Sequence, residues 1–93
     1  MEAPITLIIL TPRGEAARLR CDSVTLFAKD NAAGENGGSM GIRKGHIAAA
    51  VALEPGSEIR AFTGGERAAV FRAASGFALV KDDVVTLACT LVG

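Results

Sequence analysis

The chain has 93 residues, of which 49% are hydrophobic, so it is long enough for one small packed core and too short for a second. Ten basic and ten acidic residues give a formal net charge of zero, which argues against a nucleic-acid partner, because phosphate binding normally requires a basic excess. We therefore expect a single domain over residues 1–93, with a core of Val, Leu, Ile and Ala, since the sequence has four Phe and no Tyr or Trp.

Three short strands are predicted in the first third of the chain. Ile5–Leu10 is a continuous run of β-branched residues and Leu, and a Thr-Pro-Arg-Gly turn ends it. In Ala17–Cys21, arginines alternate with small or apolar residues, so Arg18 and Arg20 are expected on the solvated face of a strand. Val24–Ala28 gives the third strand.

The middle of the chain contains its longest expected loop. Lys29–Gly38 is rich in Gly, Asn and Asp, and at about ten residues it exceeds the usual connection between strands. Ser39–Ile42 predicts a short strand and Arg43–Gly45 a turn. His46–Leu53 contains three consecutive alanines that favour helix, but its eight residues are too few for a stable isolated helix. We favour a strand there, because all its neighbours are strand-like.

Two hairpins are predicted in the last third. Ser57–Phe62 and Ala68–Ala73 flank a Gly-Gly turn, and Phe77–Val80 and Val84–Leu91 flank Lys81-Asp82-Asp83. No amphipathic helical pattern of useful length is present. Turn signals that recur about every 8–12 residues predict an all-β fold, a small antiparallel β-sandwich or barrel.

Cys21 and Cys89 lack the close C-x-x-C pairs of a zinc site. We interpret them as buried thiols that pack as small hydrophobes. A disulfide is the less favoured alternative, because the sequence shows no signal-peptide pattern. The apolar run near the N-terminus has six residues, against about 20 for a membrane span, so we expect a soluble, cytoplasmic chain.

The residues that could carry chemistry do not form a known catalytic or phosphate-binding pattern. The glycine-rich stretch Gly34–Gly41 lacks both the P-loop and the dinucleotide fingerprint. His46 is the only histidine, and Ser75 does not lie in a G-x-S-x-G elbow. We expect His46 to pack at a turn, with no catalytic residue, no metal site and no cofactor. The residues alone favour binding to another protein.

Motifs spread over nearly the whole chain resemble one family. They are Leu7–Pro12, Gly38–His46, Leu53–Gly56, Ser75–Val80 and Val85–Ala88. In their order and spacing they are similar to the epsilon subunit of F-type ATP synthases, which is called delta in mitochondria. The family patterns are close to G-E-L-G-I-x-P-G-H-A-P-L-L-T-x-L-x-P-G and G-G-F-L-E-V-x-P-x-x-V-T-V-L-A.

The resemblance implies a β-sandwich of about ten strands and a subunit without catalytic residues. In the family this subunit belongs to the central stalk of the rotary ATP synthase and links gamma to the c-ring. It thereby couples ATP synthesis or hydrolysis to proton or sodium transport. The resemblance further implies a peripheral position at the cytoplasmic face of the bacterial inner membrane, and neither a cofactor nor a small-molecule substrate.

Carried over position by position, the resemblance assigns two sets of contact residues. The set that faces the c-ring is Gly37, Gly38, Ser39, Ile42 and Arg43. The set that faces gamma is Thr11, His46 and Val51.

Three departures from the family suggest a divergent epsilon. The sequence given stops at Gly93, where the family usually continues into a C-terminal helical hairpin, so the hairpin's inhibitory function and ATP site are not expected here. Lys44 and Ala48 replace prolines around the Gly-His motif, and the loop Lys29–Gly38 is several residues longer than is typical. The coupling ion therefore stays open.

Two other functions compete with this interpretation. The first is a free-standing β-sandwich that binds a small ligand, which would show a deep apolar pocket with convergent polar groups rather than a flat, partly apolar face. The second is an enzyme based on His46 and Ser75.

Overall fold

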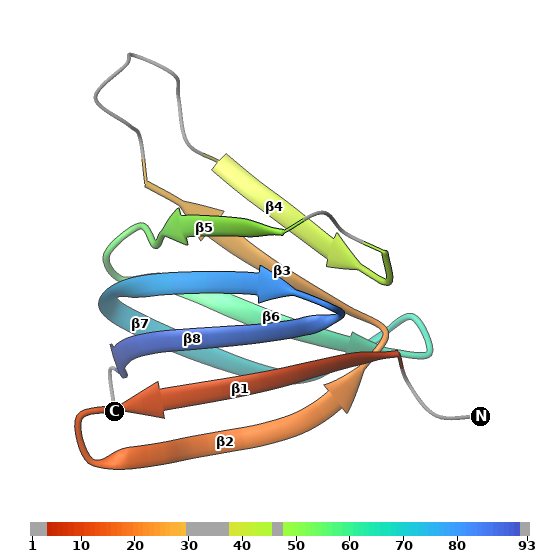
Figure 1. The fold of residues 1–93 in the computed structure, drawn as a ribbon, viewed down its shortest axis with the longest axis horizontal. Helices are drawn as coiled ribbons and strands as arrows, with labels where there is room; N and C mark the ends of the chain where they lie inside the picture. The colour runs from red at the N-terminus through yellow and green to blue at the C-terminus, as the bar shows by residue number, and fades with distance from the viewer. Residues whose placement is uncertain (1–3, 30–37, 46–47, 92–93) are drawn as a thin grey trace.

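The computed structural model describes residues 4–29, 38–45 and 48–91, which form eight strands and no helix (Figure 1). The strands in chain order are β1 (Ile5–Thr11), β2 (Gly14–Cys21), β3 (Ser23–Ala28), β4 (Gly38–Arg43), β5 (Ala49–Ala52), β6 (Ser57–Thr63), β7 (Glu66–Lys81) and β8 (Val84–Leu91). Within these ranges there is accordingly no helix that could cross a membrane.

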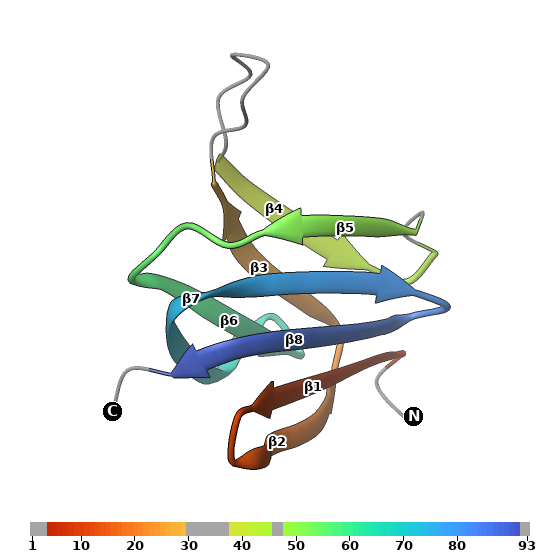
Figure 2. The same ribbon diagram turned by 60° about the vertical axis from the view of Figure 1, so that its left-hand side comes forward.

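All eight strands belong to one hydrogen-bonded sheet that folds over on itself. Its order is β2-β1-β8-β7-β6-β3-β4, and β5 is added beside β7. Every neighbouring pair is antiparallel except β1 and β8, which run parallel. Figures 1 and 2 show β7 curling from the side of β6 to the side of β8.

The 16-residue strand β7 therefore belongs to two layers. Its first half, Glu66–Ala73, pairs with β6, and its second half pairs with β5 on one side and β8 on the other. We call β4, β3, β6 and the first half of β7 the β6 layer. The second half of β7 with β5, β8, β1 and β2 is the β8 layer.

The bend in β7 occurs where its backbone packs closely against β8. The register between the two strands shifts between Ala73 and Ser75, and Gly76 has a φ of +151°, a conformation that L side chains rarely adopt. A Cβ at this position would overlap the carbonyl oxygen of Ala88 and the Cβ of Cys89. Glycine at position 76 thus permits both the backbone angle and the close approach.

The core lies between the two layers and follows the period of two that strands impose. In β1, for example, Ile5, Leu7 and Ile9 are fully buried, while Thr6 and Ile8 are half-buried on the other side. The buried residues are Ile5, Leu7, Ile9, Cys21, Val24, Leu26, Ile42, Leu53, Ile59, Ala61, Ala73, Ala78, Val80, Val85, Leu87 and Cys89. None of the described polar or charged residues is buried, so the core is apolar throughout.

The two layers are also joined at a corner where β3 and β5 end. Ala28 and Leu53 form an isolated antiparallel bridge. The amide of Lys29 donates to the carbonyl of Ala52 at 2.8 Å, and the amide of Glu54 donates to the carbonyl of Phe27 at 2.9 Å. These backbone bonds satisfy groups that would otherwise be left at the open edge.

Two hairpin turns have positive φ at both central residues, as in a type I′ turn. Gly64 and Gly65 have φ of 63° and 80°, and Asp82 and Asp83 have φ of 52° and 63°. Asp tolerates this conformation better than most non-glycine residues. The Asp83 carboxylate has a further role, because its Oδ1 accepts a 2.8 Å hydrogen bond from the amide of Gly45. It thereby fixes the turn after β4 to the turn before β8.

Most of the expected strands are confirmed, including a strand rather than a helix in the alanine-rich segment, where β5 covers Ala49–Ala52. Cys21 and Cys89 are buried free thiols, as expected. Two expectations differ from the structure. Ala68–Ala73 and Phe77–Val80 are parts of the single strand β7, so eight strands are found where the family resemblance implied about ten. The parallel pairing of β1 and β8 was also not foreseen.

We expect Gly76→Ala to lower the free energy of unfolding by about 3 kcal/mol or more, because it adds both backbone strain and overlap with β8. Gly41→Ala is the matched control, since a Cβ there meets nothing within 4 Å and its φ is not positive. Urea unfolding of the three proteins measures the difference. An equal loss in both variants would contradict the close approach as the cause.

We expect Asp83→Ala to cost about 1–2 kcal/mol, because alanine loses the acceptor for the Gly45 amide and tolerates positive φ poorly. Asp83→Asn retains an acceptor oxygen and tolerates the conformation, so it should lose less. The measurement is the thermal midpoint of each variant. Equal midpoints for Asn and Ala would show that the contact contributes nothing.

Candidate functional site

The outer face of the β8 layer is unusually apolar for a surface. The strand registers place one set of side chains together on it, which we call the apolar face: Ile8, Leu10, Ala50, Ala52, Phe77, Leu79, Thr86 and Ala88. Phe77 is 61% exposed, Leu79 52% and Leu10 39%. Large apolar side chains gathered on an exposed surface indicate a site for another molecule.

The local sequence explains why this face is apolar. In Phe77–Val80 the inward residues Ala78 and Val80 are buried, and the outward residues Phe77 and Leu79 are apolar as well. A strand with one solvated face normally alternates apolar and polar residues, whereas a strand covered on both faces does not. The pattern in β7 is therefore that of a strand covered on both sides.

Charged residues lie at the margins of the apolar face. Arg18 and Arg20 stand on β2, where they pair in register with Ile8 and Thr6 of β1, as the alternation in the sequence predicted. Arg18 forms an exposed ion pair with Glu15 at 2.8 Å. Lys81 lies at the opposite margin, in the last position of β7. An apolar centre with a charged rim is the usual arrangement of a protein interface.

The hollows on this face are open rather than enclosed. One lies between the turn at Thr11-Pro12 and the side chain of Phe77, and another lies between Ala50 and Lys81. Of the described residues, no polar side chain is buried, and no three His, Cys, Asp or Glu gather as metal ligands would. Ser75 is exposed. The described surface thus has the flat character expected of a protein-binding face rather than the convergent polar groups of a ligand pocket.

The residues that the family resemblance assigned to gamma lie in different settings. Thr11 ends β1 and borders the first hollow, and its hydroxyl donates to the carbonyl of Gly14 at 3.0 Å. Val51 is opposite Ala78 in the register and packs partly buried against the core, so it supports the apolar face from beneath. His46 lies outside the described residues. As contact residues, all three stay predictions.

The residues assigned to the c-ring are divided between the two ends of β4. Gly38 and Ser39 are exposed at its start, whereas Arg43 is exposed at its end. Ile42 is fully buried in the core, so its side chain holds β4 in place. Gly37 lies outside the described residues. These assignments also stay predictions.

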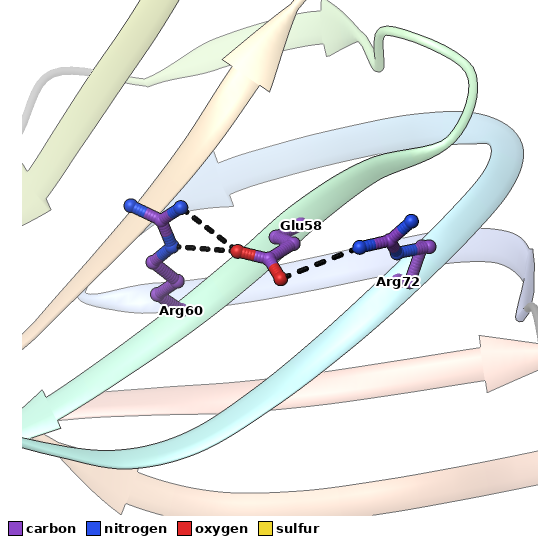
Figure 3. Close-up of polar contacts among 3 residues, drawn as sticks. All are labelled: Glu58, Arg60 and Arg72. Atoms are coloured by element: carbon purple, nitrogen blue, oxygen red, sulfur yellow. Dashed lines mark hydrogen bonds and ion pairs between the residues drawn. The ribbon is translucent and has the colours of Figure 1, made fainter.

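A polar cluster of Glu58, Arg60 and Arg72 lies on the outer face of the β6 layer (Figure 3). The sequence analysis did not predict it. The Glu58 Oε1 accepts hydrogen bonds from the Arg60 Nε and Nη2 at 3.0 and 2.8 Å, and its Oε2 lies 3.5 Å from the Arg72 Nη2. The hydrogen bond from Arg60, with the charges of both arginines, lowers the pKa of the Glu58 carboxyl.

The two cysteines also have shifted pKa values. Burial raises the pKa of the Cys21 and Cys89 thiols, and the charge of Asp22 raises that of Cys21 further.

No protein-family model and no curated protein sequence matches the chain. Solved structures do share its fold. One is a chain in the cryo-EM structure of the Euglena gracilis mitochondrial ATP synthase, comprising OSCP, F1 and the c-ring in rotational state 1. The TM-score is 0.77 at 23% sequence identity, over 97% of the present chain and 53% of the Euglena chain.

A second is a chain in the cryo-EM structure of the central stalk and c-ring of the Tetrahymena thermophila mitochondrial ATP synthase. Here the TM-score is 0.69 at 17% identity, over 98% of the present chain and 67% of the Tetrahymena chain. The chain thus spans about half the length of the first of these proteins and two thirds of the second. The all-β fold is therefore shared with chains of mitochondrial ATP synthase assemblies, as the family resemblance implied.

We expect the contribution of Glu58 to stability to decrease in acid. Its pKa is lower in the folded chain than the unfolded value of about 4.3, so its stabilising contacts are fully present above that pH and are lost as the pH falls through the folded pKa. Glu58→Gln should therefore be less stable than the unchanged chain at pH 7, and the difference should be smaller at pH 3. Urea midpoints at the two pH values measure this. A difference that is undiminished in acid would contradict it.

Proposed function

We propose that the chain is a non-catalytic subunit of the central stalk of a rotary F-type ATP synthase, related to epsilon, which links the gamma subunit to the c-ring. Its motion with the stalk would couple ATP synthesis or hydrolysis to proton or sodium transport. The observation that carries the proposal is the fold likeness over 97% of the chain, at a TM-score of 0.77, to a chain of an ATP synthase assembly. The sequence motifs that resemble the epsilon family support it independently.

The apolar face supplies the surface that such a role requires. A stalk subunit must hold its neighbour firmly enough to turn with it, and burial of a Leu or Phe side chain contributes about 1.5–3 kcal/mol. Phe77, Leu79 and Leu10 are available for this purpose. They stand on strands that are tied into the sheet on both sides, so the face is rigid. We assign this face to gamma.

The start of β4 is the proposed contact to the c-ring. Gly38 and Ser39 are exposed at the beginning of β4. A small polar surface fits the polar loops of a ring. The chain would be peripheral to the membrane and held there through the complex. Both similar structures are mitochondrial, so a place at the bacterial inner membrane rests on the sequence resemblance alone.

We expect the chain to co-purify with the gamma subunit of its own organism in a one-to-one complex. The double variant Phe77→Ser with Leu79→Ser should weaken this binding by about 100-fold or more, because two large apolar contacts are lost. Neither side chain belongs to the core, so the variant should still fold. Dissociation constants from calorimetry, with circular dichroism as the folding check, give the comparison.

The matched control is Val70→Ser, because Val70 is 39% exposed on the outer face of the other layer. It should bind gamma as the unchanged chain does. The proposal is wrong if the folded chain does not bind folded gamma at all. The assignment of the apolar face is wrong if the double variant binds as tightly as the control.

A further inference from the structure

The outer face of the β6 layer has a chemistry that the proposed function does not use. Residues that pair across neighbouring strands place their outward side chains side by side, so these side chains form rows that run across β4, β3, β6 and β7. Arg43 and Phe62 both pair with Ser23, Arg60 pairs with Thr25 and Val70, and Arg72 pairs with Glu58. We call this surface the arginine face. Its four arginines are Arg43 on β4, Arg60 on β6, and Arg67 and Arg72 on β7. Arg67 pairs with Phe62 and so lies in the same row as Arg43.

The arginine face has fewer carboxylates than guanidinium groups, so its positive charge is not neutralised by ion pairs within the face. Glu58 is its only acidic residue among the described positions, and it is shared by two arginines (Figure 3). The contact to Arg72 is long, at 3.5 Å, so this arginine is only loosely engaged. Arg43 has no ion pair within the described part of the chain. Four guanidinium groups thus share one carboxylate on the face itself, which leaves three positive charges in excess.

Two acidic residues lie at the rim, Asp22 and Glu54, and Glu54 borders an open hollow with Phe27 and Arg60. Neither forms an ion pair with an arginine of the face in the described part of the chain. The Asp22 carboxylate, beside Arg43 in an open hollow, accepts a 2.6 Å hydrogen bond from the amide of Gly64 through Oδ2. It thus fixes the turn between β6 and β7. One of these arginines is held in place, because the Arg60 guanidinium lies over the ring of Phe27 at 5.5 Å and is bonded to Glu58 by two nitrogens. A fixed guanidinium loses little freedom on binding a further carboxylate.

Apolar side chains separate the charges. Val70 is 39% exposed beside Arg60, and Phe27 and Phe62 are half-buried on the same face. A phosphate polymer would meet these side chains and the negative Glu58 at short intervals. Isolated carboxylates with apolar residues between them match the surface better. Arg43 and Arg60 stand two strands apart, which corresponds to about 10 Å between strand axes.

We propose that the arginine face binds a second protein partner, through a segment whose carboxylates are separated by apolar residues. This partner would come in addition to those proposed above, and the apolar face and the arginine face, on opposite sides of the sandwich, would serve different proteins. Arg43, Arg60 and Arg72 would receive the carboxylates. Phe27, Phe62 and Val70 would contact the apolar residues between them. This inference does not depend on the identity of the partner at the apolar face.

The test uses a synthetic 12-residue peptide that repeats Glu-Leu-Ser, titrated into the ¹⁵N-labelled chain. The expected result is chemical-shift change concentrated on β3, β4, β6 and the first half of β7, and none with the matched Gln-Leu-Ser peptide. Arg60→Gln should weaken binding by about tenfold, because a charge-assisted hydrogen bond is lost. Glu58→Gln should strengthen it by up to about fivefold, because the peptide no longer competes with an internal carboxylate.

Arg13→Gln is the matched control, because Arg13 is an exposed arginine in the turn between β1 and β2, away from this face. It should bind the peptide as the unchanged chain does. Arg72→Gln provides a second loss variant should Arg60→Gln fold poorly. Shifts on the β8 layer, equal binding of the Gln peptide, or tighter binding of inorganic phosphate than of the Glu peptide would overturn the proposal. Gamma binding measured with Arg60→Gln should be unchanged, so the two interfaces can fail separately.

Discussion

The structure depends on one strand being able to change layers. β7 pairs with β6 in its first half and with β5 and β8 in its second, and the change occurs where Gly76 lies against Ala88 and Cys89 of β8. The hydrogen-bonded ladder continues through this point with a register shift, so the bend leaves no open edge inside the fold. A side chain at this position would overlap Ala88 and Cys89 of β8, at the point where β7 joins the two layers.

The same bend separates two surfaces of opposite character. The second half of β7 presents Phe77 and Leu79 outward, whereas the first half presents Arg72 next to Glu58. One strand therefore contributes to an apolar face and to a charged face on opposite sides of the sandwich. Because the two layers share a single core, the apolar face and the charged face are held in a fixed position relative to each other. This arrangement suits the proposed role of a subunit that holds neighbouring proteins together.

The sequence predicted most strands because alternation and turn residues act locally. The pairs Gly64-Gly65 and Asp82-Asp83 marked two hairpins correctly, and both adopt the positive φ that such turns need. The prediction of two separate strands on either side of Ala74-Ser75-Gly76 was wrong, because both belong to β7. A glycine that marks a turn in one context marks a bend within a strand in another. The parallel pairing of β1 and β8 is a long-range contact that no local pattern encodes.

The site was less predictable than the fold for a related reason. The apolar face is assembled from four strands, and only the registers reveal that Leu10, Ala88 and Phe77 are neighbours. A usable signal did exist, since Phe77–Val80 is apolar at every position and a half-exposed strand should not be.

The most direct test of the account is a methyl NMR titration of the Ile-, Leu- and Val-labelled chain with its gamma subunit. The account predicts that the signals of Ile8, Leu10 and Leu79 shift at saturation, while those of Val70 and the buried Ile59 stay in place. Shifts confined to Val70, or no shifts with both proteins folded, would contradict it.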